Sequence, residues 1–500
     1  MQQYDGTGAA VEPEPPTRPA DPVPAQGPGP DAGQGPGLSP GPEIEPPQPL
    51  IPPPGRRRLA WAIGLFVALV VALALGILLA LLAKNVQLGD DSDTGKSPTQ
   101  APTPGISVSN HAEPSKARDQ AVRDLLAQRS TAVTSGDRAQ FLATVDPAAA
   151  DFYAAQSTLV DRLDALQFAD WSYELTGDGP GFTPDQKRVL PDRSVIVRVR
   201  LTYRLVGTTT STDREQYLTI VPRGDHWLVA SDTDASASGL DTQRDLWDLG
   251  PVRTLRGDTS LVVADRRGAT VAEMQKLADE ADLAVHDVDE VWTGEWSQQP
   301  LVLLPRTQAD MATIIDSDGA GLAQIAAVTT GAFEAGLSRG DRIVINPASW
   351  KTLDALGRRV VLTHEMTHVA TRSSSVQSVP IWLSEGFADY VAYRATPVPT
   401  AIVASDIFRK VLAGKAPDHL PDGADFDAAR GDIASSYESA WLACRMISEQ
   451  YGEKKLVKLY SALSDSAGPG WPDETVDVLG VGRRDLVHDW KAYLKDKASS

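Results

Sequence analysis

The chain has 500 residues and a formal net charge of −19, from 47 Lys and Arg against 66 Asp and Glu. This length allows two or three domains with cores of their own, whereas the acidic balance argues against a nucleic-acid partner, because phosphate contacts require clustered Lys and Arg. The single cysteine, Cys444, excludes an internal disulfide, and the apolar helical run around it predicts a buried thiol.

The first 112 residues predict a tail, a membrane helix and a linker. Pro, Gly, Ala and acidic residues dominate 1–55, so we expect a disordered cytoplasmic tail. Segment 56–84 joins three arginines to an uncharged apolar run, 59–83, which at a rise of about 1.5 Å per residue is long enough to cross a lipid bilayer. The arginines predict a cytoplasmic N-terminus and place the rest of the chain outside the cell membrane. A linker rich in Ser, Thr, Asp, Pro and Gly, 85–112, follows.

Residues 113–239 predict a small α+β module in which helices precede an antiparallel sheet. The clearest strand is 195–206, where Val195, Val197 and Val199 recur at every second position. The full set of expected elements is helices at 117–135, 138–145 and 148–166, and further strands at 171–176, 215–221 and 227–231. This order of elements resembles the nuclear-transport-factor-like cone fold. The resemblance implies either a ligand pocket or a spacer or docking domain, and His226, next to a turn, is assigned no chemistry.

Residues 240–500 predict a second and larger domain. Short apolar runs predict buried strands, and segments of helical period predict helices around them. We expect strands at 261–264, 301–304 and 342–346, a short apolar segment at 323–329, and helices at 270–282, 308–315, 380–395, 401–412 and 435–451, with 457–463 and 483–494 completing the domain.

The stretch His364-Glu365-Met366-Thr367-His368 carries the candidate chemistry. Residues four apart share one face of a helix, so the two imidazoles can converge on one ion, and neutral nitrogen ligands suit zinc. Glu365 can touch a water on that metal, which is the H-E-x-x-H arrangement with the glutamate as general base. Catalytic zinc needs a third protein ligand, and Glu385, on the helix expected at 380–395, is the candidate.

This motif and the following Trp382-Leu383-Ser384-Glu385-Gly386-Phe387-Ala388-Asp389 together resemble the gluzincin zinc metallopeptidases. Sixteen residues separate His368 from Glu385, slightly fewer than in the thermolysin-like and aminopeptidase branches, so the resemblance is to the clan and fixes no subfamily. It implies a mixed sheet followed by a helical lobe with the zinc helix, and Zn²⁺ held by His364, His368 and Glu385. It also implies that Asp389 orients a ligand histidine. The expected fold class is therefore α+β, with a single transmembrane helix, the cone-like module and this catalytic domain.

The same resemblance implies two further parts of the site. One is a group that stabilises the oxyanion together with zinc. Tyr437 resembles the tyrosine found there in several branches, although tyrosines on helix faces are more often packing residues; Tyr390 competes with it, and His419 and His488 are weaker candidates. The other part is an edge strand that pairs with substrate backbone, for which 326–329 is the candidate; an ordinary sheet edge is an equal alternative.

These observations predict a zinc-dependent peptidase that hydrolyses peptide or protein substrates outside the cell membrane. Endopeptidase action is preferred, because no recognisable exopeptidase motif precedes the zinc helix. The alternative is a membrane-anchored binding or scaffold protein with a peptidase-like fold and little or no catalysis. The retained Glu365 favours the enzyme, since binding alone does not need the base. A purely structural zinc is disfavoured because such sites usually have four protein ligands, often cysteines.

Overall fold

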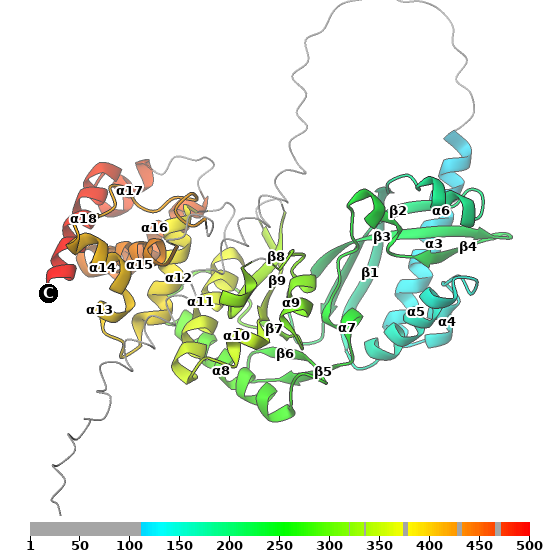
Figure 1. The fold of residues 1–500 in the computed structure, drawn as a ribbon, viewed down its shortest axis with the longest axis horizontal. Helices are drawn as coiled ribbons and strands as arrows, with labels where there is room; N and C mark the ends of the chain where they lie inside the picture. Colours follow the sequence, from blue (N-terminus) through cyan, green and yellow to red (C-terminus); the bar gives the residue numbers. More distant parts are fainter. Residues whose placement is uncertain (1–111, 320, 335–336, 374–378, 428–432, 466–471) are drawn as a thin grey trace, which may run out of the picture. The chain divides into compact units, whose positions relative to one another are not determined.

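The computed structural model describes residues 112–500 except 320, 335–336, 374–378, 428–432 and 466–471. Within these residues the chain is an α+β protein with two sheets (Figure 1). Three helices precede the first sheet, and a series of helices follows the second sheet to the C-terminus.

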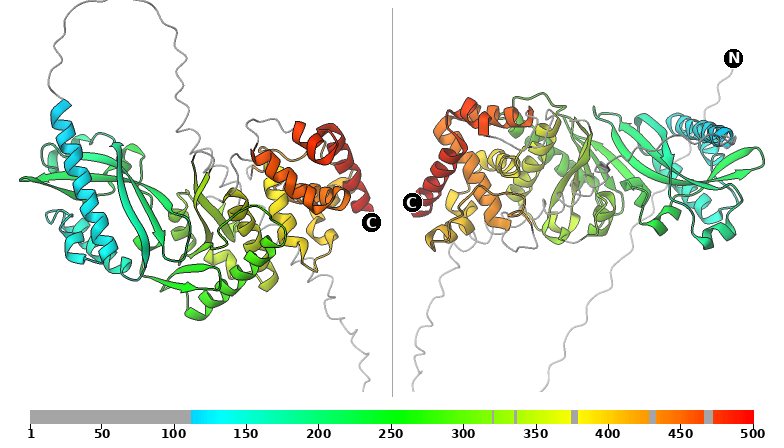
Figure 2. Two further views of the ribbon diagram at one scale, coloured as in Figure 1. Left: turned by 180° about the vertical axis from the view of Figure 1, so that it is seen from behind. Right: turned by 90° about the horizontal axis from the view of Figure 1, so that it is seen from above.

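The first sheet is antiparallel, with its strands in the order β1-β2-β3-β4. Alternate residues of β2, among them Val197, Val199 and Tyr203, are buried, so one face of the sheet is apolar. Helix α3 runs along this face (Figure 2). Its Val122 and Leu126 belong to the same hydrophobic core as Val199. The elements are α3 (Ala112–Ser135), α4 (Arg138–Leu142), α5 (Ala150–Leu163), β1 (Phe168–Asp178), α6 (Pro184–Val189), β2 (Val195–Leu205), β3 (Thr212–Arg223), β4 (His226–Ser231) and η1 (Asp234–Ser238).

The second sheet is mixed, with its strands in the order β5-β6-β7-β9-β8. The central strands pair in parallel, whereas the edge strands β5 and β8 are antiparallel to their neighbours. Every residue of β6 and β7 is buried, as expected for strands covered on both faces. The elements are α7 (Leu246–Leu249), β5 (Val252–Arg256), β6 (Leu261–Asp265), α8 (Val271–Asp289), β7 (Leu301–Leu304), α9 (Gln308–Ile314), η2 (Leu322–Gln324), β8 (Ala327–Glu334), β9 (Leu337–Ile345) and α10 (Pro347–Trp350).

The helices after this sheet share one hydrophobic core with one of its faces and with α8. The first of them, α11, packs on β8, β9 and α8, and the next, α12, packs between α11 and α15. These helices are α11 (Ala355–Ser373), α12 (Ile381–Arg394), α13 (Thr400–Val403), α14 (Ser405–Leu412), α15 (Ile433–Tyr451), α16 (Glu453–Asp465), α17 (Pro472–Leu479) and α18 (Arg483–Ser499).

The predicted fold class is corrected in its membrane element. Among the described residues, no helix is both long enough and apolar enough to cross a bilayer. The longest described helix, the 24-residue α3, carries arginines and aspartates along its length. The predicted transmembrane run, 59–83, lies outside the described residues, as do the predicted tail, 1–55, and the linker up to residue 111.

Two local predictions in the second domain also differ from the structure. Strand β5 is absent from the expected elements, because its five residues contain only two apolar ones, Val252 and Leu255, at a spacing that is not the period of a strand. The single helix expected at 401–412 is two helices, α13 and α14, which meet at Ala404. The Glu438 carboxylate accepts a hydrogen bond from the backbone nitrogen of Ile407 at 2.7 Å, in the first turn of α14. A distant side chain therefore helps to set the start of this helix.

A buried ionic network joins the two sheets. Asp245, just before α7, accepts hydrogen bonds from Arg214 of β3 and from Arg342 of β9, and all three are at least nine-tenths buried. Arg342 also donates to the Tyr203 hydroxyl of β2 at 3.1 Å. Burial alone would raise the pKa of Asp245, but the two guanidinium groups outweigh it and hold that pKa below its usual value. Tyr203 and Val344 share a core around this network, so the two sheets pack as one body there.

We expect Asp245→Ala to lower the free energy of unfolding by about 3–5 kcal/mol, because two buried arginines would lose their counter-charge. Urea unfolding followed by circular dichroism would measure this, with Asp192→Ala, at an exposed position, as the control. Both sheets should unfold together in each protein. A loss below about 1 kcal/mol, the value typical of a surface pair, would contradict the importance of the network.

Glu438 gives a pH-dependent prediction. Burial raises its pKa to about 8 from 4.5, despite the hydrogen bond from Ile407. The folded state thus keeps a proton that the unfolded state releases, so the free energy of unfolding should fall as the pH rises from 4.5 to about 8, by on the order of 1 kcal/mol per pH unit. Glu438→Gln should remove this decline, and denaturant unfolding at several pH values would measure it. Parallel curves for the two proteins would contradict the prediction; Glu295→Gln, at an exposed position, is the control.

Candidate metal centre

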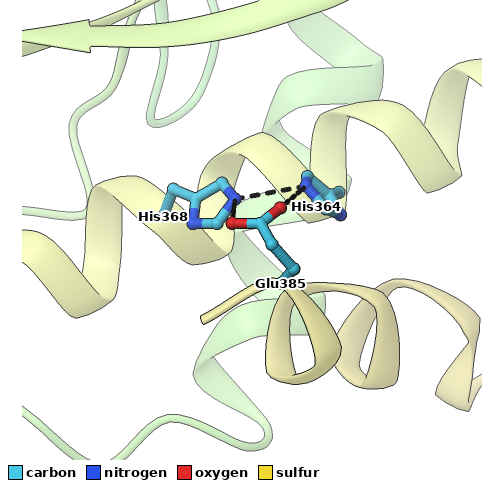
Figure 3. Close-up of side chains that lie close together, drawn as sticks. All are labelled: His364, His368 and Glu385. Atoms are coloured by element: carbon cyan, nitrogen blue, oxygen red, sulfur yellow. Dashed lines mark hydrogen bonds and ion pairs between the residues drawn. The ribbon is translucent and has the colours of Figure 1, made fainter. Parts of the chain in front are cut away.

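The two histidines of the motif face each other inside the protein. Helix α11 is buried along most of its length, and His364 and His368 are 2% and 4% exposed. Their spacing of one helical turn places both rings on one side of the helix, and their Nε2 atoms lie 3.1 Å apart (Figure 3). Two nitrogens at this distance, both directed to the same point, could bind one metal ion together.

Glu385 brings a carboxylate to the same point from α12. One carboxylate oxygen lies 3.4 Å from His364 Nε2, and the other lies 3.4 Å from His368 Nε2 (Figure 3). Zinc bonds of about 2.0–2.2 Å to nitrogen and oxygen would place neighbouring ligand atoms of a tetrahedron about 3.3–3.5 Å apart. The two 3.4 Å distances run to different carboxylate oxygens, so the carboxylate faces both nitrogens, and its spacing from each is that expected between two ligands of one zinc ion. These residues also form one of the two groups within the described residues whose side chains could hold a metal ion.

The charges of the site also favour a cation. Three buried carboxyl groups, on Glu365, Glu385 and Asp389, surround two imidazoles. Burial by itself would raise the pKa of Glu385, but the facing histidines outweigh burial and hold that pKa at about 2. Burial by itself would lower the pKa of His364, but the carboxylates of Asp389 and Glu385 raise it well above its usual value. This cluster thus requires positive charge, which protons or a metal ion can supply.

Asp389 fixes the orientation of one histidine. It follows Glu385 by one turn of α12, and its Oδ1 lies 2.9 Å from His364 Nδ1. A proton on Nδ1 that is donated to this carboxylate leaves the lone pair on Nε2, which points to Glu385 and His368. This arrangement places Asp389 where the family resemblance expects the orienting acid.

Glu365 lies beside the group formed by His364, His368 and Glu385, and it contacts the edge strand of the sheet. Its side chain is buried, and burial raises its pKa. The Thr329 hydroxyl of β8 donates a hydrogen bond to Glu365 Oε2 at 2.7 Å. Sequence reasoning selected 326–329 as a possible substrate strand but did not foresee this contact, because no residue pattern links a strand hydroxyl to a glutamate 36 positions later.

Gly386 allows α12 to approach α15 closely enough to position Glu385. A Cβ atom at this position would lie 2.3 Å from the Ala440 carbonyl oxygen and 3.0 Å from Cys444 Sγ. Because the first of these atoms belongs to the backbone of a helix, it cannot move aside without shifting α15 or α12. The glycine next to Glu385 is therefore a packing requirement of the two helices, and Cys444 is the buried thiol that the sequence predicted.

The candidates for the oxyanion group are dispersed. Tyr437 is buried on α15, with its ring edge-on to Phe426 at 5.0 Å between centroids, and its predicted role stays a prediction. The Tyr390 hydroxyl forms hydrogen bonds with Ser448 and Glu453, so its partners are other than His364, His368 and Glu385. His419 contacts Asp418 and Asp425 in an exposed loop, and His488 is exposed on α18. None of these last three is brought to the two histidines of the motif.

Comparison with known proteins assigns no family. No protein-family model matches the chain, and no curated protein matches it significantly. The chemistry of the site therefore has to be argued from its own geometry.

We expect Gly386→Ala to reduce zinc affinity about 10- to 100-fold, because α12 must shift and move Glu385 away from the two nitrogens. Competition with a fluorescent zinc chelator would measure this. The matched control is Gly423→Ala, where a Cβ atom meets nothing within 4 Å and zinc affinity should stay unchanged. Equal affinities for the two variants would show that the close contact of α12 with α15 does not position Glu385.

Proposed function

We propose that this protein is a zinc-dependent peptidase of the gluzincin type. The observation that carries the proposal is the convergence of three buried donor groups at spacings close to those between the ligands of one zinc ion. In this proposal His364, His368 and Glu385 hold the metal. One coordination position is left for water or substrate, as in catalytic rather than structural zinc sites.

The zinc ion, when bound, supplies the Lewis acidity that activates water and polarises a carbonyl group. Glu365 would take the proton from the attacking water and later deliver it to the departing amine. Asp389 would hold the ring of His364 so that Nε2 keeps its direction. Tyr437 would donate a hydrogen bond to the oxyanion that forms between these steps.

The substrate class follows from the sheet edge next to this site. Strand β8 is the edge of the second sheet and packs on α11, which carries the histidines. An extended peptide can add to such an edge through main-chain hydrogen bonds, which bind without strict choice of side chains. We therefore propose peptide or protein substrates cleaved within the chain.

A binding or scaffold role is less well supported. Burial raises the pKa of Glu365 and thereby disfavours its charged form, so placing a glutamate here has a free-energy cost. A protein that only binds gains nothing from such a residue beside the metal ligands. A purely structural zinc is also disfavoured. The three donors are two imidazoles and one carboxylate, whereas structural sites usually have four protein ligands.

We expect Glu365→Gln to retain zinc while lowering the rate of peptide hydrolysis about 10²- to 10⁴-fold, because the amide cannot accept the proton from water. Zinc would be measured by mass spectrometry, and hydrolysis with an unbiased peptide library, with and without a chelator. His368→Ala should lose both zinc and activity, whereas Glu295→Gln, at an exposed position, should change neither. Undiminished hydrolysis by Glu365→Gln, or by the wild type after zinc removal, would refute the proposal.

A further inference from the structure

The hydroxyl of Thr329 is directed at the carboxylate of Glu365. Thr329 is 1% exposed on β8, and its Oγ1 lies 2.7 Å from Glu365 Oε2 and 3.0 Å from the Glu365 carbonyl oxygen. One hydroxyl proton can be donated to only one of these acceptors at a time. The shorter distance favours Oε2 as the acceptor.

The neighbours of Thr329 on the strand do not require a polar side chain at this position. Ala327 and Val328 before it are buried among apolar residues, and Thr329 pairs across the sheet with Ile343. Valine has nearly the same shape as threonine and suits a buried strand at least as well. A buried hydroxyl is favourable only when it is hydrogen-bonded, so the contact with Glu365 accounts for the threonine.

The strand that carries Thr329 is itself tied to the zinc helix. Arg372, two turns after Glu365 on α11, donates to the carbonyl oxygen of Gly331 at 3.2 Å and pairs with Asp341 of β9 at 3.2 Å. The contacts at Thr329 and Gly331 are two residues apart on β8. The donor hydroxyl is therefore held in a fixed place along the helix.

Glu365 needs such a contact because its side chain has three rotatable bonds. A carboxylate that rotates away from the water position by about 1 Å can lose about a hundredfold in rate. The β-branched Thr329 has a stiff first torsion, so its hydroxyl offers a rigid donor. A hydrogen bond to one oxygen, Oε2, leaves Oε1 to receive the proton of the attacking water.

We propose that Thr329 is a positioning residue, which fixes the Glu365 carboxylate for proton transfer through its hydrogen bond to Oε2. This inference rests on the proposed function, since it takes Glu365 as the general base. It connects the edge strand to the chemistry in a way that does not depend on whether β8 also pairs with substrate backbone.

The test compares Thr329→Val, Thr329→Ser and Thr254→Val in the full chain loaded with zinc. Thr329→Val removes the donor, so it should lower kcat about 10- to 100-fold, with KM within about twofold and zinc content unchanged. Because the buried Oε2 atom loses its partner, Tm should fall by a few degrees. Thr329→Ser keeps the donor and should restore kcat to within about threefold of the wild type. Thr254→Val makes the same change at an exposed position of β5, at the opposite edge of the same sheet, and should leave kcat unchanged.

Equal kcat for Thr329→Val and the wild type would overturn the inference, and so would a fall in kcat that accompanies loss of zinc, because the hydroxyl would then act on the fold. Crystal structures of the zinc-loaded proteins give a second readout that does not require hydrolysis. The Glu365 carboxylate should keep one orientation in the wild type and in Thr329→Ser, and should rotate in Thr329→Val. An unchanged carboxylate in Thr329→Val would overturn the positioning role, whereas absence of hydrolysis by the wild type would overturn the proposed function instead.

Discussion

The placement of the Glu385 carboxylate against two histidine nitrogens is the constraint on which the rest of the site depends. It requires α11 and α12 to meet with a fixed register, because the carboxylate must reach both Nε2 atoms at 3.4 Å. Two contacts fix this register. Helix α12 lies closely against α15 at Gly386, and Asp389 of α12 hydrogen-bonds with the ring of His364. An error of one residue in α12 would turn Glu385 by about 100° around the helix and away from the nitrogens.

The first sheet contributes to this geometry although it supplies none of the candidate ligands. Arg342 of β9 is held by Asp245 and Tyr203, so the strand next to β8 is tied to the first sheet. The β8–β9 hairpin also packs closely against β3, where a Cβ atom on Gly340 would lie 2.5 Å from the Thr212 Cα atom. A module expected to be a spacer or a docking domain thus supports the strand that contacts Glu365.

Much of the site could be predicted because it depends on local periodicity. The spacing of His364 and His368 determines a shared helix face, and the interval of four between Glu385 and Asp389 places both on one side of α12, toward the histidines. Thr329 could not be predicted, since its partner is set by how a sheet packs on a helix. The break at Ala404 was missed for a similar reason, because the group that caps α14 is Glu438, on another helix. The membrane element of the fold class was inferred from apolar length alone, and no helix of the described chain has that character.

The carboxyl groups of the site differ in pKa in a way that separates their possible roles. Glu385 faces both imidazoles, which hold its pKa at about 2, so it stays ionised and suits a permanent ligand. Glu365 is buried as deeply, but its direct partner is the neutral Thr329 hydroxyl, and burial raises its pKa. A group that must accept a proton and then release it works best with a pKa raised toward neutrality. Two glutamates with the same side chain thus differ in pKa: the facing imidazoles outweigh burial at Glu385, whereas at Glu365 burial outweighs the lowering effects of the histidines and of the Thr329 hydroxyl.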